Sequence, residues 1–181
     1  MAITELWLVR HGESVGNVAA SAASAQKLEV VPVPARDADV ILSQTGLQQA
    51  EALGVWLGGL ESVPSAAISS PYVRAEQTLL HAIGRSGVTL PAVVDERLRD
   101  RELGILDTLT HYGVAARHPE EAMRKAWQGK FYYRPPGGES WADVALRVRS
   151  FLGDLSTRNI DGPVLIVAHD AVIMLFLYVC L

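Results

Sequence analysis

The stretch VLIVAHDAVIMLFLYVCL, residues 164–181, decides between two kinds of protein. Its length approaches the ~20 apolar residues that a membrane-spanning helix needs. His169 and Asp170 interrupt it, however, and each remaining apolar run is too short to span a bilayer. We therefore predict a buried strand followed by a buried helix, with a C-terminal membrane anchor as the alternative. No helix stop signal precedes Leu181, so the sequence leaves open whether the C-terminus is truncated.

Short apolar segments of the same kind recur along the chain, separated by helical patterns. The predicted strands are residues 5–9, 66–69, 92–94 and 164–168. Helix start signals between them are Ser43 or Thr45, Pro71, and Ser140 with Asp143 three residues later. Alternating strands and helices predict an α/β fold, a three-layer α/β/α sandwich with a mostly parallel central sheet.

Two segments depart from this alternation. Residues 19–41 are small, polar and contain proline, and are predicted to form a loop. Residues 105–138 are predicted to form an inserted cap lobe with one helix around residues 119–127. We therefore expect residues 1–181 to form a single domain that carries this small lobe.

The composition of the chain indicates which kinds of partner it binds and in which cell compartment we expect it. A formal net charge of -4 argues against a nucleic-acid-binding surface, which usually shows as a basic domain or stripe. The single cysteine, Cys180, permits no internal disulfide, and the N-terminus has no secretory signal pattern. We expect a cytoplasmic protein that binds neither nucleic acid nor membrane. Its oligomeric state stays open, with a homodimer as one candidate.

Basic side chains follow three of the predicted strands. Arg10 and His11 come directly after the first strand, Arg74 lies five residues beyond the second, and His169 follows the last. Ligands of open parallel sheets bind beyond the carboxyl ends of the strands. These four side chains are therefore predicted to converge at one edge of the sheet, as a cationic cluster in an acidic protein.

The residue types in this cluster favour phosphate chemistry. No HExxH, GxSxG, Walker A or GxGxxG motif occurs, and arginine in its charged form does not ligate metals. Two guanidinium groups can hold phosphoryl oxygens through paired hydrogen bonds. A neutral imidazole is in addition a competent nucleophile.

Five motifs in the expected order resemble the histidine phosphatase superfamily, in its phosphoglycerate-mutase-like branch. They are LVRHGES with Asn17, LSQTGLQQA, SSPYVRAEQT, GGES and VLIVAHD. The resemblance implies that His11 is phosphorylated during turnover on a small phosphorylated substrate. It also implies that Arg10, Asn17, Arg74 and His169 bind the phosphoryl group, with His169 as a cation, and that neither a cofactor nor a metal is needed.

The general acid is less clear. LRDRELG, residues 98–104, resembles the segment that usually supplies a glutamate two residues after the leucine, and Asp100 occupies that position here. Glu102 is the alternative, because it lies on the same face if the segment is extended. The family also usually has glycine where this chain has Asp170, which adds a negative charge beside the phosphate pocket.

Three functions remain open at this point. We favour phosphomonoester hydrolysis, with broad specificity as one form of it. A cofactor-dependent phosphoglycerate mutase is second; in the mutases a pair of arginines follows the tryptophan of the inserted lobe, but here Trp127 precedes Gln128 and Gly129, with Lys130 and Arg134 nearby. A non-catalytic protein that binds phosphorylated ligands is third, because of the substitutions at the acid position and after His169.

Overall fold

A parallel sheet forms the centre of the protein. The computed structural model describes residues 3–33 and 36–181. Its strands are β1 (Ile3–Arg10), β2 (Ala66–Ser69), β3 (Ala92–Val94) and β4 (Gly162–Ala168). They lie in the order β1-β4-β2-β3, and every neighbouring pair is parallel. The predicted fold class is confirmed, and β4, whose residues 164–168 are all fully buried, lies in the interior of the sheet.

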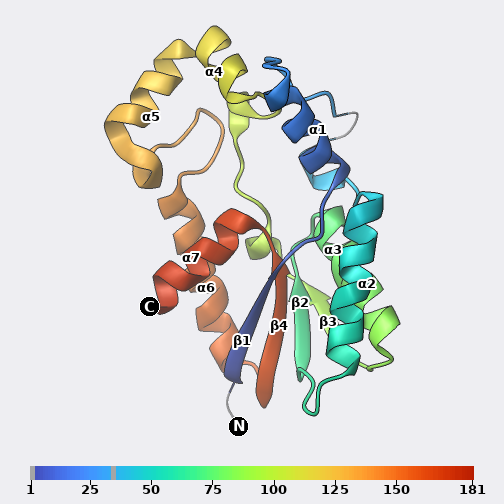
Figure 1. Ribbon diagram of the computed structural model, residues 1–181. Helices are drawn as coiled ribbons and strands as arrows, with labels where there is room; N and C mark the ends of the chain where they lie inside the picture. The colour runs from blue at the N-terminus through green and yellow to red at the C-terminus, as the bar shows by residue number, and fades with distance from the viewer. Residues whose placement is uncertain (1–2, 34–35) are drawn as a thin grey trace.

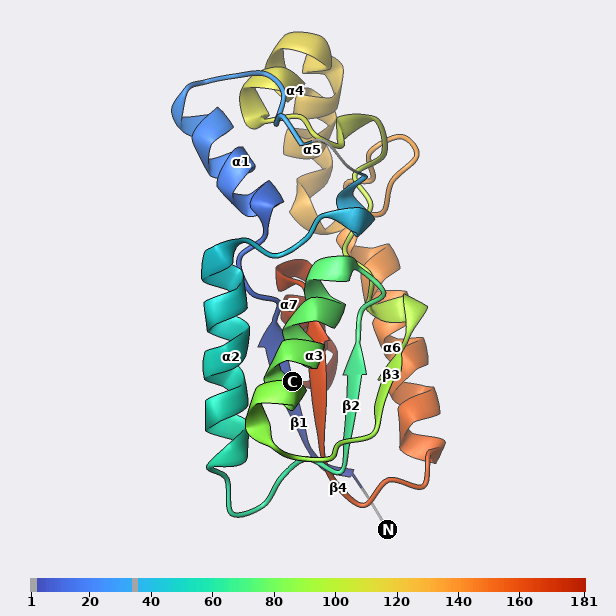
Figure 2. The same ribbon diagram turned by 90° about the vertical axis from the view of Figure 1, so that its right-hand side faces the viewer.

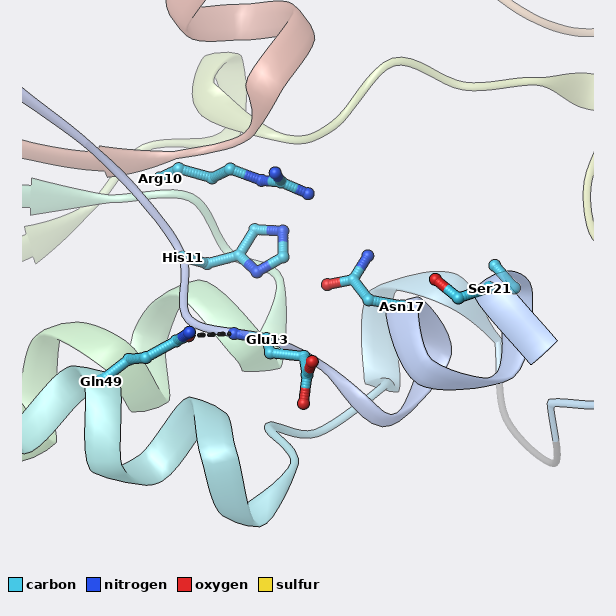
Figure 3. A pocket seen from close by; sticks show the side chains of 7 residues that line it. Arg10, His11, Glu13, Asn17, Ser21 and Gln49 are labelled. Atoms are coloured by element: carbon cyan, nitrogen blue, oxygen red, sulfur yellow. Dashed lines mark hydrogen bonds between the residues drawn. The ribbon is translucent and has the colours of Figure 1, made fainter. Parts of the chain in front are cut away.

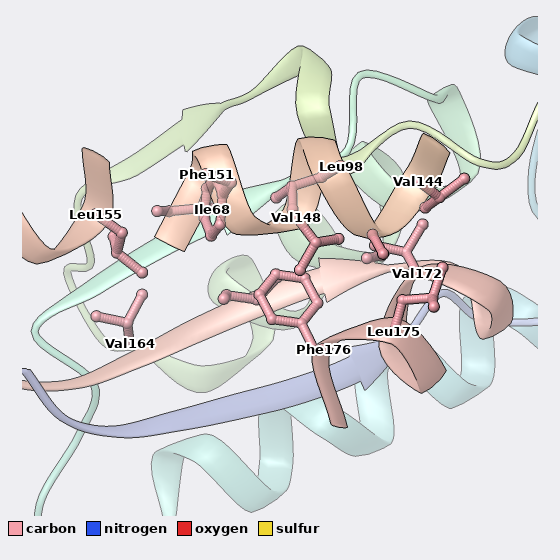
Figure 4. Close-up of a cluster of buried hydrophobic side chains, with 13 residues drawn as sticks. Ile68, Leu98, Val144, Val148, Phe151, Leu155, Val164, Val172, Leu175 and Phe176 are labelled. Atoms are coloured by element: carbon pink, nitrogen blue, oxygen red, sulfur yellow. The ribbon is translucent and has the colours of Figure 1, made fainter. Parts of the chain in front are cut away.

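Helices cover both faces of this sheet. Figures 1 and 2 show α2 (Gln44–Gly58) and α3 (Val73–Ser86) on one face. The opposite face carries α6 (Trp141–Thr157) and α7 (Asp170–Cys180). Side chains of α6 and α7 interlock over β4 in the larger of two apolar clusters, where Phe151 and Phe176 are fully buried (Figure 4). None of the described helices combines the length and the apolar character that crossing a bilayer requires.

The remaining helices lie beyond the carboxyl ends of the strands. Figure 1 shows α1 (Val15–Ala25), α4 (His111–Arg117) and α5 (Pro119–Tyr132) at that end of the molecule. Short 3-10 turns, η1 (Asp37–Asp39), η2 (Glu96–Leu98) and η3 (Gly104–Leu106), join the layers. The loops that leave the strands therefore run between the sheet and this group of helices.

Capping residues in the sequence predicted the starts of most helices correctly. Ser43 caps α2 and Ser140 caps α6, where it forms the predicted capping box with Asp143. The prediction for Pro71 was wrong, because Tyr72 is the N-cap of α3 and Pro71 precedes it. Each hydroxyl cap accepts a hydrogen bond from a backbone N–H in the first turn, which explains why serine marked its helix better than proline did.

Two loop predictions need correction. Residues 19–41 are not a continuous loop, since α1 extends to Ala25 and η1 forms a turn. Alanine has the highest helix propensity, and a capping box between Ser14 and Asn17 starts this helix. Residues 105–138 hold two helices rather than one, because Thr110 caps α4 in addition to the proline start of α5.

Candidate active site

The carboxyl edge of the sheet brings the predicted basic cluster together. His11 follows β1 and its backbone N–H donates to Ala168 O at 3.0 Å, so it lies beside the end of β4. The rings of His11 and His169 are 5.0 Å apart between centroids. Arg74 Nε donates to His11 Nε2 at 3.3 Å. His11 and His169 are 158 residues apart in the sequence (169 minus 11), yet the strands that precede them bring both to one pocket.

His11 is held as a neutral imidazole with a defined tautomer. Its Nδ1 lies 2.6 Å from Gly12 O, and because a carbonyl only accepts hydrogen bonds, Nδ1 carries the proton. The lone pair is then on Nε2. Burial, with smaller contributions from Arg74 and Arg10, lowers the pKa of His11 to about 4, against the opposing effect of its hydrogen bond to Gly12. Above that pH, Nε2 is unprotonated, as a nucleophile must be.

The loop after His11 is fixed by close backbone packing. Gly12 N–H donates to Thr78 Oγ1 at 3.0 Å, and the same hydroxyl donates to Arg74 O at 2.7 Å. A Cβ on Gly12 would lie 2.6 Å from Gly46 O, which no side chain tolerates. Glycine is therefore required at position 12 by the approach of α2. Thr78 was not singled out from the sequence, although it lies within the SSPYVRAEQT motif.

Arg74 is 4% exposed and every one of its nitrogens is engaged. Nη1 donates to Asp37 O at 2.6 Å and to Asp37 Oδ1 at 3.1 Å. Nη2 donates to Asp37 Oδ2 at 3.1 Å and to Asp100 Oδ2 at 3.2 Å. Asp37 thus orients the guanidinium from the segment that was predicted to be a loop. No motif marks Asp37 in the sequence, so only the fold could reveal it.

The two candidate acids have different surroundings. Asp100 Oδ2 contacts Arg74 and lies 3.4 Å from His169 Nδ1, while Oδ1 accepts from the Arg101 N–H at 2.8 Å. Burial raises the pKa of Asp100 against the opposing influence of Arg74. Glu102 is exposed and accepts a hydrogen bond from Tyr72 Oη at 2.9 Å. Asp100 is therefore the carboxyl group directed at the histidines.

An ion pair whose side chains are 10% and 12% exposed supports the backbone of the segment that carries Asp100. Arg147 Nε and Nη2 each donate to the Glu139 carboxylate at 3.0 Å. Arg147 also donates to the carbonyls of Arg97 at 2.6 Å and Asp100 at 3.2 Å. This arrangement gives the GGES motif a structural role through Glu139. The helical pattern around Arg147 did not single it out in the sequence.

His169 is completely buried, at 0% exposure. Its Nε2 lies 2.8 Å from Ser70 Oγ. Among the described residues, His169 Nδ1 is the one buried side-chain N or O atom without a hydrogen-bond partner. Burial, then Arg74 and His11, lower the pKa of His169 to about 2. In the protein without ligand it is therefore neutral; the cation predicted from the sequence is one paired with a bound dianion, and that remains a prediction.

A pocket of about 400 Å³ opens over these groups. It is lined by Arg10, His11, Asn17, Arg74 and Asp100, among others. A second pocket of about 490 Å³ adjoins it, and Figure 3 shows Arg10, His11 and Asn17 together in it.

Asn17 has a structural duty as well, because its Oδ1 accepts the Ser14 N–H at 3.0 Å and so caps α1. Asp170 is exposed, lines the 400 Å³ pocket and occupies the first turn of α7, where the helix dipole favours an acid. Its negative charge therefore stays at the rim. Within residues 3–33 and 36–181, no group of three or more histidine, cysteine or acidic side chains is arranged to hold a metal ion.

Comparison with known proteins agrees with this geometry. A 2,3-bisphosphoglycerate-dependent phosphoglycerate mutase from Rhizobium meliloti is 32% identical over 169 residues, which cover 91% of this chain and 73% of the relative. A glucosyl-3-phosphoglycerate phosphatase from Mycolicibacterium vanbaalenii is 33% identical over 180 residues, covering 96% and 72%. The relatives thus include both phosphatases and mutases.

Solved structures share the fold. The native mycobacterial glucosyl-3-phosphoglycerate phosphatase superposes with a TM-score of 0.71 at 32% identity, covering 93% of this chain and 74% of that one. The family model of the histidine phosphatase superfamily (branch 1) matches residues 6–181, which include His11, Arg74 and His169. The chain therefore belongs to the histidine phosphatase superfamily, branch 1.

Proposed function

We propose that this protein hydrolyses small phosphomonoesters through a phosphohistidine on His11. The observation that carries the proposal is the protonation geometry of His11, with Nδ1–H held by Gly12 O and an Nε2 lone pair beside Arg74. Attack on phosphorus requires this lone pair, which accepts the Arg74 Nε–H in the protein without ligand. The buried guanidinium next to it can neutralise charge on the phosphoryl oxygens.

In the first half-reaction, His11 Nε2 attacks phosphorus and forms an N–P bond as the bond to the leaving oxygen breaks. Arg10, Arg74 and the Asn17 amide lie around the pocket to hold the phosphoryl oxygens. Asp100 gives its proton to the leaving oxygen, so that the product departs as a neutral alcohol. The raised pKa of Asp100 favours the protonated form that this step requires.

In the second half-reaction, the Asp100 carboxylate accepts a proton from water. The resulting hydroxide attacks phosphorus, the N–P bond breaks and inorganic phosphate leaves. His11 returns to its neutral form, and Asp100 is protonated again. One carboxyl group thus serves as acid and then as base.

The inserted lobe favours hydrolysis over mutase activity. A mutase must hold a second anionic group, which calls for further cations directed at the site. Lys130 Nζ instead lies 4.1 Å from the centroid of the Trp141 ring, and Arg134 Nε pairs with Asp143 at 3.0 Å. Neither lines a pocket that contains His11, and Trp127 is 86% exposed.

Phosphate release from p-nitrophenyl phosphate, with and without EDTA, tests the proposal. We expect hydrolysis that EDTA does not change, and its loss in His11→Ala. His81→Ala, on the exposed side of α3, is the matched control and should remain active. Exchange of 2- and 3-phosphoglycerate without hydrolysis would instead indicate a mutase. Wild-type hydrolysis by His11→Ala would rule out the covalent mechanism.

A further inference from the structure

Ser70 is a buried hydroxyl group that the reaction above does not use. It follows β2 and is 0% exposed. Its Oγ accepts a hydrogen bond from the Tyr72 N–H at 3.2 Å and lies 2.8 Å from His169 Nε2. Because the opposite side of the His169 ring faces Asp100, Ser70 is placed to control which ring nitrogen carries the proton.

Of the two positions for the proton of the neutral His169 ring, one satisfies the hydrogen bonds of the Ser70 hydroxyl. A serine hydroxyl has one proton to donate and two lone pairs to accept with. If His169 Nε2 carried the proton, it would donate to Ser70 Oγ, and the hydroxyl proton would have no acceptor among the hydrogen bonds of residues 3–33 and 36–181. If Nε2 carries the lone pair, Ser70 donates to it while still accepting from Tyr72. Only the second arrangement leaves nothing unsatisfied at Ser70.

We propose that Ser70 is a positioning residue that holds His169 as the neutral tautomer protonated at Nδ1, so that Nδ1–H donates to a phosphoryl oxygen of the substrate. Nε2 is occupied by Ser70, so Nδ1 is the nitrogen that remains for a ligand. It lies 3.4 Å from Asp100 Oδ2, and Asp100 lines the 400 Å³ pocket. The inference rests on the proposed function for its catalytic consequence, but not for the tautomer itself.

The two histidines then carry out opposite tasks with the same tautomer. Gly12 O holds the proton of His11 on Nδ1 and leaves the Nε2 lone pair for the phosphorus. Ser70 holds the proton of His169 on Nδ1 and presents that N–H to the oxygens. Their rings are 5.0 Å apart, so a phosphoryl group can meet one acceptor nitrogen and one donor nitrogen at once. A second imidazole with the wrong tautomer would instead direct a lone pair at an anion.

Long-range proton–nitrogen NMR of protein with 15N-labelled histidine tests the tautomer directly. The His169 signals are identified by their loss in His169→Gln. We expect a protonated Nδ1 and an unprotonated Nε2 in the wild type, and a mixture of tautomers in Ser70→Ala. A wild-type spectrum with the proton on Nε2 would overturn the proposal. This measurement needs no turnover, so it stands even if the protein is not a phosphatase.

Binding of inorganic phosphate, measured by calorimetry, tests the consequence. Removing the hydroxyl should weaken phosphate affinity roughly tenfold in Ser70→Ala, because loss of one buried hydrogen bond allows the wrong tautomer to form. Ser70→Cys keeps a weak donor of similar size, so its phosphate affinity should lie between those of the wild type and Ser70→Ala. Ser69→Ala, the same change at the last residue of β2, should bind like the wild type. Wild-type affinity in both Ser70 variants would overturn the proposal.

If Ser70→Ala fails to fold, Ser70→Cys alone still decides the question, through its tautomer and its affinity relative to Ser69→Ala. The same three variants are then assayed for hydrolysis of p-nitrophenyl phosphate. We expect kcat/KM to fall in the order of their phosphate affinity. A wild type that binds phosphate with the expected tautomer but hydrolyses nothing would remove the proposed function and leave the role of Ser70 in place.

Discussion

Acidification should destabilise this protein through His11. Its pKa is about 4 in the folded protein and 6.5 in an ordinary exposed setting, so the unfolded chain binds a proton first as the pH falls. The free energy of unfolding therefore decreases below pH 6.5 and levels off near pH 4. At pH 5 these two pKa values correspond to about 2 kcal/mol lost relative to pH 8. This is a substantial part of the roughly 5–15 kcal/mol that stabilises a typical domain.

Comparison with His11→Gln isolates this contribution. Glutamine is neutral at every pH, while His169 and the carboxyl groups titrate in both proteins. Asp100 opposes the trend, because its raised pKa makes the folded protein bind a proton first. Urea unfolding at pH 8 and pH 5, in buffers without phosphate or sulfate, should show a fall about 2 kcal/mol larger in the wild type than in the variant.

A matched control and a clear contrary result complete the design. His81→Gln replaces an exposed imidazole on α3 and should show the same fall as the wild type. If His11→Gln lost as much stability between pH 8 and pH 5 as the wild type, His11 would not be a buried neutral base. The nucleophile assigned to it would then need another explanation.

Three further predictions address the acid, its support and the packing of the nucleophile loop. Asp100→Asn should lower kcat/KM about 10²–10⁴-fold for alkyl phosphates and far less for p-nitrophenyl phosphate, whose leaving group needs no proton, and equal losses for both would contradict an acid role. Glu139→Ala leaves its buried arginine partner unpaired and should lower the free energy of unfolding by about 3–5 kcal/mol in urea titrations; an unchanged midpoint would argue against this pair. Gly46→Ala places a Cβ 2.0 Å from Glu13 O and should reduce both stability and activity. Gly153→Ala, whose Cβ would have no atom within 4 Å, should leave both unchanged. Thermal unfolding measures the stability of each variant, and the phosphatase assay measures its activity.

The sequence predicted the strands and the four basic residues because both leave strong local signals. Apolar runs ending in charged residues mark strands that lead into a site, and parallel strands bring their carboxyl ends to one edge. The groups that orient the site leave no such signal. Asp37 lies between short turns without a motif, and Arg147 is one of several charges on an ordinary amphipathic helix. Their roles depend on which distant backbone they meet, and that is a property of the fold.

The protonation states of His169 and His11 also depend on burial, which the sequence does not give. The sequence analysis expected His169 to be a cation beside a dianion, which follows from charge alone. In the protein without ligand, burial lowers the pKa of His169, and Arg74 and His11 lower it further, so the imidazole is neutral until an anion binds. For His11 too, burial lowers the pKa more than Arg74 and Arg10 do. Charges can be counted in a sequence, but desolvation requires the structure.

The proposed acid, Asp100, is an aspartate at a position where the sequence resemblance implies a glutamate. An aspartate side chain is one methylene shorter, so its backbone must lie closer to the reacting groups. Arg147 donates to the carbonyls on both sides of this segment while Glu139 holds its guanidinium from below. With the backbone fixed in this way, Asp100 Oδ2 reaches within 3.2 Å of Arg74 and 3.4 Å of His169. The position of Asp100 is thus fixed by a largely buried ion pair, and the shorter side chain is compatible with the acid role that we propose.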